Sequence, residues 1–249
     1  MIRQKIVAGN WKMNGSKESI VSLISGLLEM DSSSSEVVVA PSFPYLSQVD
    51  GLISASSIVL AAQNVSQEVK GAFTGEVSTS MLGDFGVKYV LLGHSERRSL
   101  YGETNELVAS KVKTVLDSGL TPMLCIGETL AERESGKTLE ICEQQLQAVI
   151  DLVGIASFEQ LVIAYEPVWA IGTGLSASAE QAQEVHESIR SFLAKSSESV
   201  SQKVQILYGG SVKASTSSAL FQMPDVDGAL VGGASLDAKE FIAIVKTAG

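Results

Sequence analysis

The segment AYEPVWAIGTG, residues 164–174, closes a short apolar run with a tyrosine, a glutamate and a proline, and then continues into two glycines. Similar runs, rich in apolar and β-branched residues, recur along the chain and alternate with longer segments of helical periodicity. The runs predict strands at residues 6–9, 37–40, 59–62, 89–92, 121–126, 161–165, 205–208 and 228–231. The longer segments predict helices that include residues 16–30, 104–118, 138–153, 179–196 and 237–248. Polar residues suited to N-caps stand at helix starts, as in SKESI and TNELV.

Apolar strands that alternate with helices predict an α/β fold with a parallel sheet covered on both faces. Eight such units in 249 residues are typical of a single-domain (β/α)8 TIM barrel spanning residues 1–249. An open doubly wound sheet has the same periodicity, so the positions of polar and glycine residues decide between the two. They follow the first, fourth, sixth, seventh and eighth strands: Asn10 and Lys12, His94, Glu166, Gly209 and Gly210, Gly232 and Gly233. An open sheet would spread these positions along an edge, whereas closure gathers them at one mouth, so we predict the barrel.

The composition is that of a globular enzyme, with 45% hydrophobic and 18% charged residues. The formal net charge of −10 argues against nucleic acid or an anionic membrane as a partner, since either requires a basic face. No apolar run reaches the roughly 18 residues of a membrane span, and the N-terminus lacks a signal-peptide core. Cys125 and Cys142 lack metal-binding spacing and fall in predicted core elements, which favours reduced thiols in a cytoplasmic protein.

Glu166 is the first candidate for chemistry. Most glutamates are solvated, but apolar residues precede this one, Pro167 restricts its backbone, and Val168 and Trp169 are placed to shield it from water. Partial desolvation increases the basicity of a carboxylate. The following AIGTG segment offers glycine N–H groups and a flexible end, as a lid requires. We therefore interpret Glu166 as a catalytic base.

His94 follows an apolar strand in VLLGHSERR, where a histidine is often only structural. N–H groups at the start of the next helix disfavour imidazolium and would leave a neutral ring that donates a hydrogen bond to a substrate oxygen. The other histidine, His186, stands among Glu and Gln in a predicted helix and is expected at the surface. Lys12, beside Asn10 in GNWKMN, is a plausible anchor for an anionic substrate, and Trp11 is expected to pack away from the mouth.

Two glycine doublets, in YGGSV and VGGAS, follow the last two predicted strands. Each could be a plain tight turn, but together they stand where barrel enzymes commonly build a phosphate site from backbone N–H groups. Ser211 adds a hydroxyl, and Gly172 another N–H. The loop of residues 65–78 is longer than a simple turn and carries Phe73, so it is either a local flap or a projection that docks into another subunit.

These segments, in this order, resemble the triosephosphate isomerase family over almost the whole chain. The matching segments are GNWKMN, AAQNV, GAFTGEVS, YVLLGHSERR, YGET, PMLCIGET, AYEPVWAIGTG, YGGSV and GALVGGAS. The resemblance implies cofactor-independent and metal-independent interconversion of dihydroxyacetone phosphate and glyceraldehyde 3-phosphate, a small phosphorylated three-carbon substrate, in glycolysis and gluconeogenesis. It also implies a cytoplasmic homodimer.

The resemblance further implies a role for each site residue. Glu166 would move a proton between neighbouring carbons, His94 would polarise the carbonyl, Lys12 would balance negative charge, and Asn10 would fix an oxygen. N–H groups of Gly172, Ser211 and Gly233, with Gly232 shaping the turn, would hold the phosphate while residues 167–177 close. Ser95, Glu96 and Cys125 would support these side chains, and Phe73, Thr74 and Glu76 would contact the partner subunit. The chain departs from the common family pattern at Leu175, Ser176 and Lys213, and in QEVK before GAFTGE.

Two other functions fit a barrel of this composition. An aldolase that forms a Schiff base needs a lysine deep in the barrel, and none of the predicted strands contains one. A non-catalytic binding protein on a degenerate barrel is expected to have lost Glu166, His94 or Lys12, and all three are present. The sequence therefore favours the isomerase.

Overall fold

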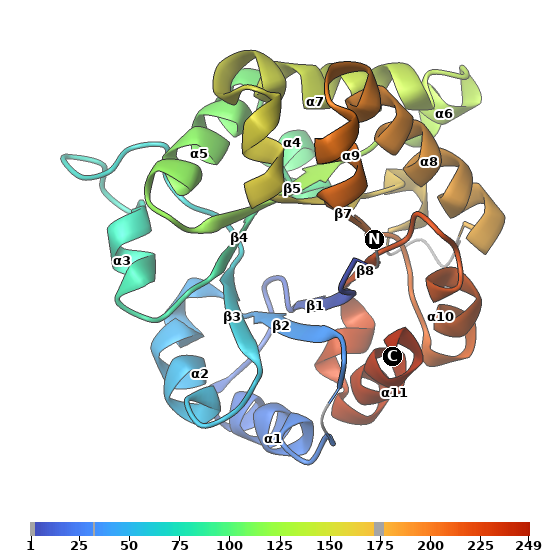
Figure 1. Cartoon of the computed structure of the whole chain (residues 1–249). Coiled ribbons are helices and arrows are strands. Elements are labelled where there is room, and N and C mark those ends of the chain that lie inside the picture. The colour runs from blue at the N-terminus through green and yellow to red at the C-terminus, as the bar shows by residue number, and fades with distance from the viewer. Residues whose placement is uncertain (1–2, 32, 172–176) are drawn as a thin grey trace.

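Eight parallel strands close into a barrel, in the order β1-β2-β3-β4-β5-β6-β7-β8, in a computed structural model that describes residues 3–31, 33–171 and 177–249 (Figure 1). The strands are β1 Ile6–Asn10, β2 Glu36–Ala40, β3 Val59–Ala62, β4 Tyr89–Leu92, β5 Thr121–Ile126, β6 Val162–Tyr165, β7 Gln205–Tyr208 and β8 Gly228–Val231. Each agrees with its predicted range to within one residue at either end. The barrel prediction is confirmed, and the open-sheet alternative is excluded because β1 pairs with both β2 and β8.

Helices surround the barrel on its outer side (Figure 1). They are α1 Lys17–Leu27, α2 Leu46–Ile53, α3 Thr79–Gly83, α4 Ser95–Tyr101, α5 Asn105–Asp117, α6 Leu130–Glu134, α7 Thr138–Val153, α8 Ala179–Ser196, α9 Glu198–Lys203, α10 Ala214–Phe221 and α11 Ala238–Ala248. Short 3-10 helices stand at η1 Phe43–Tyr45, η2 Ile155–Gln160, η3 Val168–Ala170 and η4 Gly233–Leu236. None of the helices in the described part of the chain has the length and apolar character needed to cross a bilayer.

Strand residues alternate between two buried layers. On β1, Ile6 and Ala8 point into the barrel, whereas Val7 packs in the layer between strands and helices. Trp11 also belongs to that outer layer and is 1% exposed, as expected for a packing residue. The seam between β1 and β8 depends on Gly228, whose φ is +136° and where a Cβ would stand 1.8 Å from the carbonyl oxygen of Ile6. Closure of the barrel therefore requires glycine at this position.

The prediction that His186 is a surface residue is wrong. Its side chain is fully buried on α8, against the rings of Tyr165 and Tyr208 at centroid distances of 5.8 and 6.4 Å. The polar neighbours of His186 in sequence suggested exposure, but the inward face of the helix is set by residues three and four apart. His186 shares that face with Ala182 and Ile189.

Candidate active site

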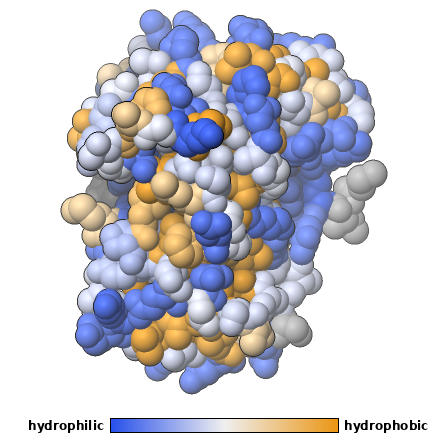
Figure 2. All heavy atoms as spheres, turned by 90° about the vertical axis from the view of Figure 1, so that its left-hand side faces the viewer, coloured by the Kyte–Doolittle hydropathy of each residue, from blue (hydrophilic) through white to orange (hydrophobic). Residues whose placement is uncertain are grey.

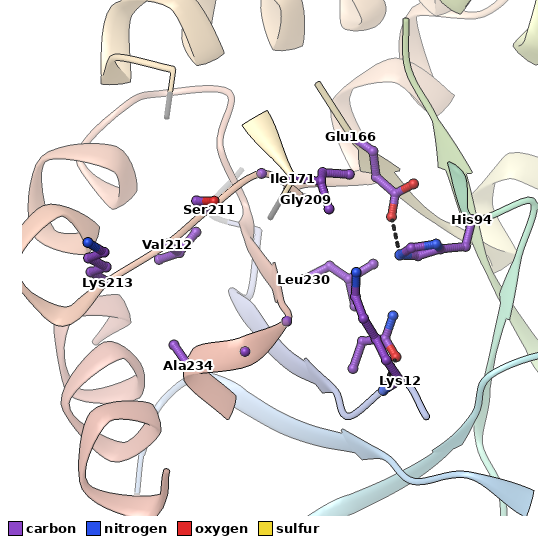
Figure 3. Close-up of a pocket in the computed structure, with 14 residues that line it drawn as sticks. Lys12, His94, Glu166, Ile171, Gly209, Ser211, Val212, Lys213, Leu230 and Ala234 are labelled. Carbon is purple, nitrogen blue, oxygen red and sulfur yellow. Dashed lines mark hydrogen bonds and ion pairs between the residues drawn. The ribbon is translucent and has the colours of Figure 1, made fainter. Parts of the chain in front are cut away.

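A cavity of about 400 Å³ opens at the carboxyl ends of the strands. Its walls come from β1, the turn after β4, the end of β6 and the segments that follow β7 and β8 (Figure 3). The lining residues are Asn10, Lys12, His94, Glu166, Ile171, Gly209, Gly210, Ser211, Val212, Lys213, Leu230, Gly232, Gly233 and Ala234. The structure thus brings together all the predicted catalytic and substrate-binding residues except Gly172, which lies outside the described residues together with Leu175 and Ser176.

Glu166 directly follows β6, and its side chain is only 2% exposed. Its Oε1 lies 3.1 Å from Nε2 of His94, and its Oε2 accepts a hydrogen bond of 2.8 Å from the backbone N–H of Ser95 (Figure 3 shows the contact with His94). A carboxylate that is removed from water and held by two N–H donors has a fixed orientation. Ser95 therefore contacts the candidate base through its backbone.

His94 is the N-cap of α4, and its Nδ1 accepts a hydrogen bond of 3.2 Å from the backbone N–H of Glu96. This hydrogen bond assigns the ring proton to Nε2, because a nitrogen that accepts in this way carries no proton. Nε2 is the atom that faces Glu166, so the ring presents a neutral N–H donor to the cavity. The arrangement agrees with the expectation that N–H groups at a helix start would face this ring.

Lys12 adopts a left-handed backbone conformation with φ of 51°, the only non-glycine residue with positive φ in the described part of the chain. Asn10 stabilises this turn by accepting a 3.0 Å hydrogen bond from the Lys12 N–H through Oδ1. The Lys12 carbonyl in turn accepts from Gln63 Nε2 at 2.8 Å and from Ser42 Oγ at 2.7 Å. The Lys12 ammonium forms an ion pair with Glu96. Sequence reasoning missed the two residues that bond the carbonyl, although Gln63 belongs to the quoted AAQNV segment.

The segments after β7 and β8 form the opposite wall of the cavity from His94 (Figure 3). Ser211 donates to the carbonyl of Ala170 from its N–H at 3.1 Å and from its hydroxyl at 2.8 Å. Gly232 and Gly233 form the turn that begins η4, and the Gly232 carbonyl accepts from the N–H and the hydroxyl of Ser235. This wall is made of backbone and small side chains, which suits close approach of a phosphate group.

A buried carboxylate behind the cavity was not anticipated. Glu128 is 0% exposed and accepts from the hydroxyl of Tyr165 at 3.1 Å and from Nε1 of Trp169 at 3.0 Å. Arg133 lies 3.4 Å from the same carboxylate and stacks over the Trp169 ring. Burial, together with the charge of Glu128, raises the pKa of Tyr165 well above its ordinary value. These contacts fix the start of the segment expected to close, and at its other end the Ala177 N–H donates to the Tyr208 hydroxyl at 3.3 Å.

Cys125 is fully buried inside the barrel, and burial, reinforced by the charge of Glu166, raises the pKa of its thiol well above the usual range. Cys142 is also buried, and both thiols are free of disulfides. Over the described ranges, no cluster of three or more His, Cys, Asp or Glu side chains has the geometry to hold a metal ion.

A closed (β/α)8 barrel with a desolvated carboxylate and a neutral imidazole at its carboxyl-end mouth defines a barrel enzyme of the acid–base class. The sequence model of triosephosphate isomerase matches residues 5–248. The triosephosphate isomerase of Hydrogenovibrio crunogenus is 57% identical, covering 100% of this chain and 99% of that protein. Those of Thiobacillus denitrificans and Psychromonas ingrahamii are 55% and 54% identical, each over 99% of this chain and at least 99% of the relative. The chain therefore belongs to the triosephosphate isomerase family, and its activity is the aldose–ketose isomerisation of triose phosphates.

Proposed function

We propose that the chain interconverts dihydroxyacetone phosphate and glyceraldehyde 3-phosphate with Glu166 as the base and neutral His94 as the electrophile. The observation that carries this proposal is the 3.1 Å approach of Glu166 Oε1 to His94 Nε2 at the wall of one cavity. Triosephosphate isomerases are themselves the standard example of this pairing of a carboxylate with an uncharged imidazole.

Glu166 removes a proton from the carbon beside the carbonyl, and His94 donates its Nε2 proton to the carbonyl oxygen. The deprotonated ring takes the proton of the neighbouring hydroxyl, and Glu166 returns its own proton to the former carbonyl carbon. A substrate oxygen replaces Glu166 as the acceptor of the Nε2–H, which frees the carboxylate to reach carbon.

Charge and position are supplied by the surrounding residues. Lys12 offsets the negative charge of the enediolate and phosphate, and Asn10 holds both the lysine turn and a substrate oxygen. Ser211, Gly232, Gly233 and Gly172 would hold the phosphate, with the Ser211 N–H exchanging its present acceptor, the Ala170 carbonyl, for a phosphate oxygen. This chemistry uses only groups of residues 1–249, acting as one domain, and we expect no cofactor or metal.

A coupled assay of glyceraldehyde 3-phosphate isomerisation tests the assignment. We expect Glu166→Asp and His94→Gln each to lower kcat by about 10²–10⁴-fold, because each removes a positioned proton-transfer group. Circular dichroism should remain unchanged, since neither substitution empties a large core volume. Glu134→Asp, on an exposed residue of α6, is the matched control and should turn over normally. Wild-type protein that does not exceed the buffer rate, or a Glu166→Asp variant with full activity, would reject the assignment.

We infer that the working form is a homodimer in the cytoplasm. Large apolar side chains are exposed on the face of the molecule turned to the viewer in Figure 2, where α3 and the loop of residues 65–78 lie, and include Val69 at 62%, Phe73 at 45% and Met81 at 52%. A pocket of about 270 Å³, lined partly by Met13, Lys12, His94 and Tyr101, lies beside the catalytic cavity. If the loop of residues 65–78 enters this pocket in a second copy of the chain, its exposed apolar side chains are removed from water.

The dimer has its own test. Sedimentation at micromolar concentration should give twice the 26.2 kDa chain mass. Thr74→Arg, at the tip that would enter the partner's pocket with Glu76, should shift the mass toward the monomer and reduce turnover. A wild-type protein that sediments as a monomer would refute the cross-subunit role of Phe73, Thr74 and Glu76.

A further inference from the structure

Lys213 is a cation of the cavity wall to which the isomerisation chemistry assigns no role. It follows Ser211 and Val212 at the α10 edge of the cavity, on the far side of these residues from Glu166 and His94 (Figure 3). The side chain is exposed and forms no ion pair with any residue that the structure describes. Lys12, the other lysine that lines the cavity, forms an ion pair with Glu96.

Helix stability does not explain a lysine at this position. Lys213 is the N-cap of α10, where the helix dipole is positive and where Ser, Thr, Asn or Asp is preferred. The carboxylate of Glu240 supplies the capping that Lys213 does not, because its Oε1 accepts from the Ala214 N–H at 2.8 Å. The chain therefore places a positive charge where it is locally unfavourable, at the outer edge of the phosphate side of the cavity.

The charged side chains at the mouth of the cavity do not balance without this lysine. Glu166 is negative, and the ion pair of Lys12 with Glu96 is neutral, so without Lys213 the mouth would carry net negative charge on a chain that already carries −10. Such a field repels a phosphate ester dianion. We propose that Lys213 captures the substrate dianion at the phosphate end of the cavity, raising kcat/KM without taking part in proton transfer. This inference rests on the proposed placement of the phosphate at Ser211, Gly232 and Gly233.

Coulomb's law sets the size of the effect. Loss of a unit charge that lies about 10 Å from a dianion in water lowers the rate of substrate capture about threefold at ~0.01 M ionic strength, where the Debye length is about 30 Å. At ~1 M, where that length is about 3 Å, the effect falls to nearly nothing. Because triosephosphate isomerases are a standard example of enzymes at the diffusional ceiling, slower capture is expressed directly in kcat/KM.

The experiment measures kcat and kcat/KM of the full chain across this range of sodium chloride for wild type, Lys213→Gln and Lys213→Arg. The matched control is Lys246→Gln, which makes the same change in net charge at an exposed residue in the last turn of α11. We expect Lys213→Gln to lose about threefold in kcat/KM at ~0.01 M salt, to keep its kcat, and to converge with wild type at ~1 M. Lys213→Arg and Lys246→Gln should follow wild type throughout.

Three outcomes overturn the inference: unchanged kcat/KM of Lys213→Gln at low salt, an equal loss in Lys246→Gln, or a loss confined to kcat. Binding of inorganic phosphate, measured by calorimetry at low salt, gives a readout that does not require turnover. Phosphate should bind about threefold more weakly to Lys213→Gln than to wild type. If wild type and Lys213→Gln bind phosphate equally, the role of Lys213 is refuted even where turnover is normal. If the threefold difference in phosphate affinity is found but wild type shows no turnover, only the catalytic assignment is rejected.

Discussion

Acidification should destabilise this protein through one buried side chain, His186. Its Nδ1 lies 3.1 Å from the carbonyl oxygen of Asp225 and donates to it, because a carbonyl oxygen only accepts, so the neutral ring carries its proton on Nδ1 and none on Nε2. That Nε2 is buried without a hydrogen-bond partner. Protonation would therefore place a positive charge in a fully buried site between Tyr165 and Tyr208, and Arg190 nearby adds like charge. Burial is the main cause that lowers the pKa of His186 from 6.5 to about 4.

The sign and size of the effect follow from linkage. Because the folded-state pKa lies below the unfolded-state value, the unfolded chain binds more protons between about pH 6.5 and pH 4, and stability falls as the pH falls through this window. The contribution is about 2 kcal/mol between pH 7 and pH 5 and about 3 kcal/mol by pH 4. Above pH 7 this residue makes no pH-dependent contribution.

The test compares the wild type with His186→Asn, whose amide can still donate to the Asp225 carbonyl but does not titrate. Free energies of unfolding are measured in urea at pH 7 and pH 5, at one protein concentration so that association affects both proteins alike. The variant should be less stable at pH 7, because the ring between the two tyrosines is lost, but its stability should fall by about 2 kcal/mol less on acidification than that of wild type. An identical fall in both proteins would refute the reasoning.

Two further substitutions test other parts of the structure. Gly209→Ala places a Cβ 2.8 Å from Cγ of Glu166 and 3.0 Å from the carbonyl oxygen of Tyr165, so the carboxylate must shift, and kcat in the coupled assay should fall by about 10–100-fold. Unchanged kcat would show that the carboxylate position is not critical. Arg190→Met leaves the carboxylates of Asp225 and Asp227, 2.7 and 2.8 Å from its guanidinium, without that partner, and should cost about 3–5 kcal/mol of unfolding free energy. A loss below ~1 kcal/mol would mean that solvent or Arg3 replaces the guanidinium.

The amino-acid sequence alone determined the eight strands, the barrel and the residues that meet at its mouth. The periodicity of a strand is a local property of the sequence. A residue that follows a strand lies at the carboxyl end of that strand because the chain connects them, whatever packs around it. Closure of the barrel then gathers Asn10, Lys12, His94 and Glu166 at one cavity, as the positions of the polar residues predicted.

Only the tertiary structure decided which polar groups are buried and what each one bonds. The carboxylate of Glu128 is buried because Tyr165 and Trp169 pack over it. The ring of His186 is buried because its face of α8 packs against Tyr165 and Tyr208. The orientation of Glu166 depends on the backbone N–H of Ser95 at the start of α4, and the Lys12 carbonyl is held by Gln63 from the segment after β3. Such contacts join residues far apart in the chain, so local patterns carry no record of them.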